Sequence, residues 1–307
     1  MVTSMAMAKQ YKWQLRRGGR KEVCPSCGHR TFVPYVLTAN PDIKAGPEYG
    51  RCDRENNCGY IRYPQAVKAP SNVQPVAPKT LTPIRMDWDA VARTLGRSNL
   101  FSYAATLVGV DEATKAWNAY KIGAWRGFTV FWQIDSKGEV RGGKGIPYGY
   151  DGHRLKGDSV AHALWLHKCK DFASNTHGDE LEQCFFGEHL LPTIKDTKKV
   201  AIVESEKTAL LMSAINNDFV WLASGGSQGL TERKCKALDG YKVVLYPDNN
   251  MYWKWLGIAN RYGWQVSQVC ERDFTLSKGF DLLDIYEQVN GTPIKNVKND
   301  VERIFQH

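Results

Sequence analysis

The chain has 307 residues, 24% of them charged, and a formal net charge of +9. This length suits two or three domains and allows a substantial hydrophobic core. No apolar run is long enough to cross a bilayer, and the opening "MVTSMAMAKQ" lacks the apolar stretch of a signal peptide. The sequence therefore argues against a membrane protein and predicts a cytoplasmic one.

Positive charge is concentrated at the amino end, where the first 70 residues hold 12 Lys and Arg against 5 Asp and Glu. Such an excess favours a nucleic acid as partner, because each phosphate that a cation neutralises releases condensed counterions. The segment "YKWQLRRGGRK" also mixes aromatic and basic residues, which suits base stacking combined with backbone contacts. The alternative is a solvated basic strand beside a small domain.

Two close cysteine pairs predict a zinc site in this basic region. The pairs occur in "CPSCGHR" and "CDRENNC" and comprise Cys24, Cys27, Cys52 and Cys58. Thiolates are preferred zinc ligands, and disulfides do not persist in the cytoplasm. His29 is a competing ligand, and four unliganded cysteines are the alternative. A closed site with four thiolates is structural, so we assign it to folding and DNA contact.

The middle of the chain predicts helices followed by a β-hairpin. Residues 87–122 show helical apolar spacing, and "GFTVFWQIDSKGEVRGGKG" alternates apolar residues on both sides of a turn. The return strand carries Arg141 and Lys144 among glycines, which let a backbone approach a phosphate. This basic hairpin is either a template or nucleotide groove or an ordinary exposed hairpin.

After residue 190 the sequence alternates strands and helices, which predicts a mostly parallel sheet with right-handed crossovers. Polar residues collect at the predicted strand ends, where such sheets place their ligand sites. These residues are Glu204, Gly225, Gly226, Asp248, Asn250, Asp281 and Asp284. Asp248 and Asn250 are two residues apart, so in an extended strand their oxygens would face one magnesium ion. A simple turn at "PDNN" and a helix-capping role for Glu204 are the alternatives.

Four motifs in order, "VAIVESEKTALL", "WLASGGSQGLT", "VVLYPDNN" and "KGFDLLDIY", resemble the toprim domain of bacterial-type primases, topoisomerases and related nucleases. The resemblance covers roughly residues 198–290. The basic hairpin, "FFGEHLL" and the zinc ribbon extend it toward primases, so the chain resembles a primase-like protein of a phage or mobile element.

The resemblance implies roles for particular residues. Glu204 is expected to act as a general acid/base or beside the metal, and Asp248, Asp281 and Asp284 to bind Mg²⁺ or Mn²⁺, with Asp281 favoured over Asp284 as a ligand. Asn250 stands where relatives have a second aspartate, so the site should bind a divalent cation more weakly. Arg141, Lys144, Gly225 and Gly226 would contact template or nucleotide.

The expected fold class is α/β, with a toprim (Rossmann-like) parallel sheet at the carboxyl end, preceded by an α+β basic subdomain and a zinc ribbon. The expected domains are a zinc ribbon at 1–65, a proline-rich linker at 66–86, the basic subdomain at 87–190 and the toprim domain at 191–307.

The leading functional hypothesis is synthesis of short primers on single-stranded DNA from nucleoside triphosphates. A toprim nuclease and a non-catalytic DNA-binding replication or mobilisation factor are the alternatives, and Asn250 favours the second of these. A P-loop pattern is absent, so a helicase would be a separate partner. The remaining cysteines lack ligand spacing and are expected to pack as small apolar groups; they are Cys169, Cys184, Cys235 and Cys270. His167 and His189 are expected to be structural.

Overall fold

The computed structural model divides into two compact units, Met1–Thr80 and Leu81–His307. It describes the following residues: 12–54, 57–65, 82–156, 163–194, 199–226, 228–271 and 280–290. The two units are described separately. Among these residues, no helix has both the length and the hydropathy needed to cross a membrane.

The smaller unit is a five-stranded antiparallel sheet. Its strands are β1 (Trp13–Leu15), β2 (Phe32–Leu37), β3 (Asn40–Lys44), β4 (Gly50–Cys52) and β5 (Ile61–Arg62). Around the cysteines its buried apolar cluster contains Cys24, Phe32 and Cys52, with Cys27, Cys58 and Tyr60 packed against them. β2 adds a few more buried apolar residues, namely Tyr35, Val36 and Leu37. A core of this size stabilises a fold weakly, so a bound metal would contribute much of its stability.

The larger unit begins with a six-stranded antiparallel sheet. Its strands are β6 (Arg85–Met86), β7 (Gly123–Trp125), β8 (Phe128–Ile134), β9 (Val140–Pro147), β10 (Leu164–Trp165) and β11 (Thr176–His177). The predicted hairpin is confirmed, because β8 and β9 pair antiparallel along their whole length. The helices predicted before it are also confirmed, as α1 (Trp88–Thr94), α2 (Asn99–Val108) and α3 (Val110–Ala119). Three short 3₁₀ helices follow the hairpin, at Leu166–Lys168, Lys170–Asn175 and Glu188–Thr193.

Much of the predicted linker, residues 66–81, lies outside the described residues. Its last residues, Arg85–Met86, form β6, which pairs with both β9 and β11. The antiparallel sheet therefore includes chain that precedes residue 87.

The carboxyl half contains a parallel sheet with the strand order β13-β12-β14-β15. The strands are β12 (Lys199–Val203), β13 (Phe219–Ala223), β14 (Val243–Leu245) and β15 (Gln265–Val266). The helices are α4 (Glu206–Ile215), α5 (Glu232–Cys235), α6 (Tyr252–Tyr262) and α7 (Leu282–Asn290). The predicted alternation of strands and helices is thus confirmed for this half.

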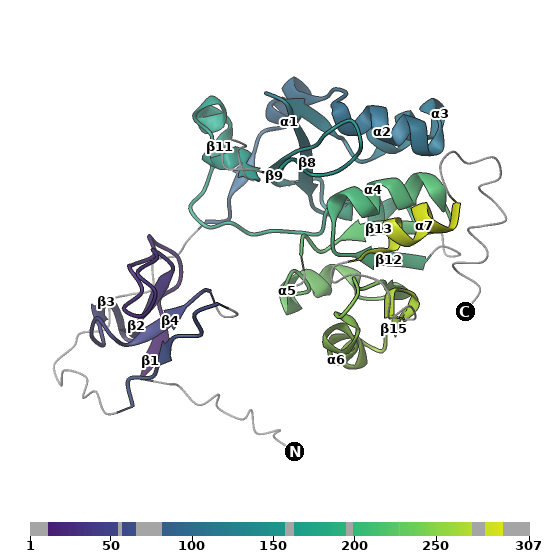
Figure 1. The fold of residues 1–307 in the computed structure, drawn as a ribbon. Coiled ribbons are helices and arrows are strands. Elements are labelled where there is room, and N and C mark those ends of the chain that lie inside the picture. Colours follow the sequence, from purple (N-terminus) through teal and green to yellow (C-terminus); the bar gives the residue numbers. More distant parts are fainter. Residues whose placement is uncertain are drawn as a thin grey trace, which may run out of the picture. The chain divides into compact units, whose positions relative to one another are not determined.

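Helices cover both faces of the parallel sheet (Figure 1). Along β12, Ala201 and Val203 belong to the cluster that contains residues of α4 and α7. Val200 and Ile202 belong to the cluster that contains Trp255 and other residues of α6. This division follows from the alternation of side chains along a strand, which places successive residues on opposite faces.

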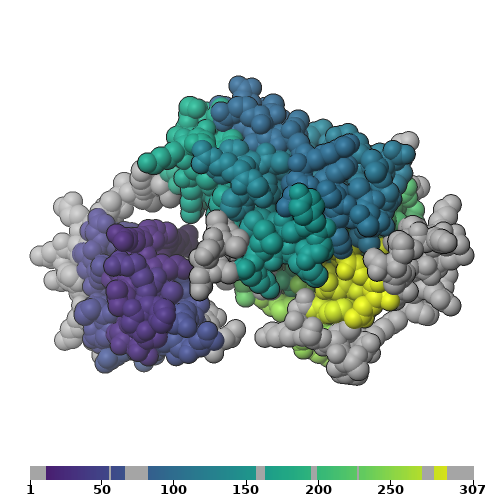
Figure 2. Space-filling view, turned by 45° about the horizontal axis from the view of Figure 1, so that its top comes forward, coloured from purple at the N-terminus to yellow at the C-terminus, as the bar shows by residue number. Residues whose placement is uncertain are grey.

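One hydrophobic core joins the two halves of the larger unit. The cluster on the α4 side also includes Leu100 of α2, Trp117 of α3 and Phe131 of β8. In Figure 2 the yellow surface of α7 lies beside the blue surface of α2 and α3, and Tyr103 of α2 hydrogen-bonds to Glu287 of α7. The antiparallel and parallel sheets are therefore held together by packing.

Candidate functional site

The four predicted zinc ligands lie together in the smaller unit. The Sγ atoms of Cys24, Cys27, Cys52 and Cys58 all lie within 4.8 Å of one another. The pairs Cys24–Cys58 and Cys27–Cys52 are separated by 3.8 and 3.9 Å. Four sulfurs arranged tetrahedrally at about 2.3 Å from zinc would be separated by about 3.8 Å. The cluster therefore has the dimensions of a tetrahedral zinc site.

Local hydrogen bonds prepare two of these thiols to ionise. A hydrogen bond from the His29 backbone lowers the pKa of Cys27 to about 6, and the Thr31 hydroxyl lowers the pKa of Cys52. Burial raises the pKa of Cys24 to about 11. His29 is not part of the cluster. Its Nδ1 lies 2.8 Å from the Arg54 guanidinium and 2.8 Å from the Cys27 carbonyl. The choice between Cys58 and His29 as fourth ligand thus falls on Cys58.

Three acidic residues lie at the carboxyl end of the parallel sheet. Glu204 directly follows β12, Asp248 lies three residues after the end of β14, and Asp281 directly precedes α7. The backbone connects these segments, since the Gly225 N–H donates to the Glu204 carbonyl and the Asn249 N–H donates to Phe280. We call Glu204, Asp248 and Asp281 the acidic edge.

Burial and neighbouring carboxylates raise the pKa of two residues of the acidic edge, Glu204 and Asp248. Burial, opposed by Lys254 and reinforced by Asp281, raises the pKa of Glu204 to about 7. Burial and the charges of Glu204, Asp281 and Asp284 raise the pKa of Asp248 to about 9. Glu204 Oε1 is also buried and has no hydrogen-bond partner among the residues that the structure describes. A divalent cation fits these groups, because it would neutralise the charge and supply that oxygen with a partner.

The carboxylates do not yet form a tight ligand set. Within the described parts of the chain, only the four cysteines form a group of three or more ligand side chains within 4.8 Å of one another. Binding a cation at the acidic edge would therefore require side-chain rotation to bring Glu204, Asp248 and Asp281 closer together.

Asp281 and Asp284 cap the start of α7. Asp281 Oδ1 accepts from the N–H groups of Leu283 and Asp284 at 2.9 and 3.1 Å, and Asp284 Oδ2 accepts from the Asp281 N–H at 2.8 Å. This exchange is a capping box with aspartate at both positions. Asp281 Oδ2 also accepts from the Thr208 hydroxyl at 2.5 Å. Asp281 thus faces α4 as well, whereas the Asp284 carboxylate accepts from the Asp281 N–H at the start of its own helix.

The extended geometry expected for Asp248 and Asn250 is absent. β14 ends at Leu245, and the Met251 N–H donates to the Asp248 carbonyl at 3.0 Å, so these residues lie in a turn. Asn250 is exposed and has a left-handed φ of 71°, a conformation that asparagine tolerates better than most residues. Its side chain contacts Asn249, which is buried and donates to the Cys270 carbonyl.

The cations of the basic hairpin are both engaged in internal ion pairs. Arg141 donates through Nε and Nη2 to Asp135 Oδ2 at 2.8 and 2.7 Å. Lys144 donates to the two carboxylate oxygens of Glu206 at 2.8 and 3.0 Å. Their side chains are only 14% and 17% exposed. Lys144 therefore links β9 to the first turn of α4.

Two charged residues near the glycine-rich turn, Glu206 and Lys234, were not predicted from the sequence. Glu206 is the second glutamate of "VESEK", and its place two residues after a strand-end glutamate was the available signal. Lys234 of α5 is 5% exposed and donates to the Ser224 carbonyl at 3.0 Å, and burial lowers its pKa. Gly225 and Gly226 have φ of 83° and 137°, and a Cβ on Gly225 would lie 3.5 Å from Glu206 Oε1. The glycine-rich turn thus passes between Glu206 and Lys234.

The cysteines and histidines expected to be structural are buried or partly buried. Cys184, Cys235 and Cys270 are buried, and Cys169 is partly buried. His189 lies 2.9 Å from the Ala119 carbonyl, and burial lowers its pKa and that of His167.

Comparison with known families matches residues 10–72 to a putative zinc beta-ribbon finger, in agreement with the cysteine cluster. Residues 98–249 match a family described as a domain of unknown function, DUF6371. No curated protein matches the chain.

The solved structures that are similar to the chain include three DNA primases or parts of them. The zinc-binding and RNA polymerase domains of Aquifex aeolicus primase share 17% identity, with a TM-score of 0.39 over 64% of this chain and 46% of that one. The DnaG catalytic core shares 17% identity, with a TM-score of 0.38 over 64% and 59%. The primase fragment of the bacteriophage T7 primase-helicase shares 14% identity, with a TM-score of 0.41 over 93% and 98%. The chain spans about half the length of the first two.

Proposed function

We propose that this chain is a primase-like protein of the phage or mobile-element type, with a toprim domain at residues 191–307. It binds single-stranded DNA and joins nucleoside triphosphates into short primers with Mg²⁺ or Mn²⁺. The observation that carries this proposal is the acidic edge, where burial and neighbouring carboxylates raise the pKa values of Glu204 and Asp248. Raised pKa values at the carboxyl end of a parallel sheet are characteristic of functional sites.

The acidic edge suits phosphoryl transfer. Glu204, Asp248 and Asp281 would hold the divalent cation, which lowers the charge between an attacking hydroxyl and a triphosphate. A pKa of about 7 allows Glu204 to accept or release a proton near neutral pH. Asp284, as a cap of α7, supports the position of Asp281.

Groups around the acidic edge and in the zinc ribbon suit binding of the triphosphate and of the template. Lys144, held by Glu206, and the turn at Gly225 and Gly226 lie beside the acidic edge and suit the triphosphate. The zinc ribbon suits contact with the template strand, because its unit is basic and has exposed aromatic residues such as Tyr63. A helicase would act as a separate partner.

The test is a single reaction that contains labelled ribonucleotides, single-stranded templates of varied sequence, and Mg²⁺ or Mn²⁺. Short de novo products that disappear with Glu204→Gln and persist with the control Lys115→Ala would support primer synthesis. Shortened template without such products would replace it with a nuclease. Retention of the template without either reaction would leave a DNA-binding factor.

The non-catalytic alternative has its own supporting observation. Asn250 is exposed in a turn and brings no charge, and the carboxylates do not lie within 4.8 Å as a set. A binding factor would keep single-stranded DNA affinity when Glu204 is changed to Gln, and would show no products with either metal.

A further inference from the structure

Helix α6 presents an exposed stripe that its role in the core does not explain. Trp255 and Ala259 are fully buried against the parallel sheet and anchor the helix. The outward face carries a different set of exposed residues, namely Trp253, Lys254, Gly257, Asn260 and Arg261. Their spacing places them in one stripe along the helix, which is about 16 Å long. The helix contains no acidic residue.

The start of this stripe adjoins the acidic edge. α6 begins four residues after Asp248, and Lys254 is close enough to Glu204 to lower its pKa. Trp253 is 80% exposed, more than any other large hydrophobic side chain that the structure describes. An exposed tryptophan beside a lysine offers a stacking surface and a cation together.

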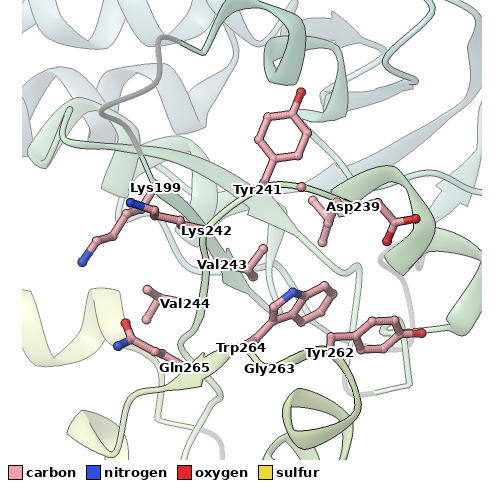
Figure 3. Close-up of a pocket in the computed structure, with 12 residues that line it drawn as sticks. Lys199, Asp239, Tyr241, Lys242, Val243, Val244, Tyr262, Gly263, Trp264 and Gln265 are labelled. Atoms are coloured by element: carbon pink, nitrogen blue, oxygen red, sulfur yellow. The ribbon is translucent and has the colours of Figure 1, made fainter.

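The end of the stripe leads into a cavity of about 490 Å³ at the amino end of the parallel strands (Figure 3). Tyr262 and Trp264 line it as a stacked pair, with ring centroids 4.5 Å apart and planes at 19°. Figure 3 shows Lys199 and Lys242 together on one side, and Asp239 on the opposite side. The volume lies in the range of ordinary ligand pockets, and the lining combines aromatic rings with cations.

The cations of this surface differ from those of the hairpin. Arg141 and Lys144 are neutralised by internal carboxylates. By contrast, several exposed cations form no ion pair with another described residue, namely Lys199, Lys242, Lys254 and Arg261. Four exposed cations that form no ion pair with another described residue, together with exposed or half-exposed aromatic rings, match the chemistry of single-stranded nucleic acid, whose backbone is anionic and whose bases stack.

The middle of the stripe leaves room for a close approach. A Cβ on Gly257 would meet no atom within 4 Å, so packing does not require glycine at this position. Glycine inside a helix is unfavourable relative to alanine, and its benefit is that another molecule can approach the backbone.

We propose that a nucleic acid single strand binds along α6, from the acidic edge to this cavity. We call the surface formed by Trp253, Lys254, Arg261, Lys199 and Lys242 the α6 track. The inference rests on the proposed function only in taking single strands as the ligand. The proposal places the contact with the nucleic acid on α6 and not on Arg141 and Lys144 of the hairpin.

The test is fluorescence anisotropy of the full chain with labelled oligothymidylate and oligouridylate over a series of salt concentrations. Trp253→Ala should weaken binding about tenfold without changing the salt dependence, because a ring and no charge is lost. Lys254→Ala combined with Arg261→Ala should lower the slope of log affinity against log salt by about 1.4, which is about 0.7 per contact. Lys199→Ala with Lys242→Ala should lower it equally. The exposed control Lys115→Ala should match wild type.

Wild-type behaviour of Trp253→Ala, or an unchanged slope for either pair, would overturn the α6 track, as would wild-type protein that binds neither oligonucleotide. Tighter binding of oligothymidylate would identify the DNA template as the ligand, and tighter binding of oligouridylate would identify the RNA primer.

Primer synthesis is measured on the same samples. If wild type makes primers and the α6 variants behave like it, only the track is wrong. If wild type makes none but binds through α6, only primer synthesis is wrong.

Discussion

Changing Asp248 to asparagine should stabilise the protein without Mg²⁺, by an amount that grows with pH. Burial and the neighbouring carboxylates raise the pKa of Asp248 from an ordinary value of 3.8 to about 9. Below pH 3.8 the carboxyl is protonated in both folded and unfolded chains. Between 3.8 and 9 the folded chain retains a proton that the unfolded chain has lost, so stability falls as the pH rises. Asparagine keeps the shape and does not titrate.

The structure sets the size of this effect. At pH 7, about 1.36 kcal/mol for each pH unit above 3.8 gives an upper limit of about 4 kcal/mol. Asp248 is partly exposed, and water reaching it reduces this figure to about 2 kcal/mol. The Asp248→Asn variant should therefore exceed wild type by about 2 kcal/mol at pH 7 and by almost nothing near pH 4.

The assay is urea unfolding of wild type and Asp248→Asn between pH 4 and pH 8, without chelators, so that zinc is retained. Mg²⁺ should stabilise wild type, increasingly as the pH rises, and should have little effect on the variant. Asp239→Asn, at an exposed carboxylate, serves as the control. A stability difference that is the same at pH 4.5 and pH 7.5 would refute the reasoning, because the buried charge would then not be its cause.

Further predictions concern the zinc site, the buried ion pair, α6 and the turn after β14. Purified protein should contain about one zinc per chain, and Cys27→Ser should lose it and unfold the smaller unit; full zinc content by metal analysis in the variant would contradict the site. Glu206→Gln should destabilise the larger unit by about 3 kcal/mol in urea unfolding, because it leaves Lys144 mostly buried without its partner, and Glu112→Gln on the surface is the control. Gly257→Ala should raise the free energy of unfolding by about 1 kcal/mol. A lower free energy of unfolding in the variant would mean that another group occupies the space beside residue 257. Asn250→Asp should tighten Mg²⁺ binding in calorimetry, since added charge raises affinity for hard cations; equal affinity would place residue 250 away from the metal.

The sequence alone determined the features that depend on local patterns. The spacing of Cys24 and Cys27 and the later pair indicated the zinc cluster, because a short turn between two ligands is encoded within a few residues. The alternation around "DSKGE" indicated the β8–β9 hairpin, and apolar runs separated by helical periods indicated the parallel sheet. Burial of one side of each element produces these periods, so they can be read without knowing the neighbours. The positions of Glu204 and Asp248 at strand ends followed from the same patterns.

Tertiary structure decided which charged groups face one another. Lys144 and Glu206 are 62 residues apart and meet because β9 packs beside α4. Asp284 caps α7, and Asn250 occupies a left-handed turn because β14 ends three residues before Asp248. The raised pKa of Asp248 and the cavity beside α6 likewise depend on elements brought together from distant parts of the chain. The energies of ion pairs and pKa shifts depend on the distances between groups and on their burial when elements pack together. The periodicity of a sequence does not contain this information.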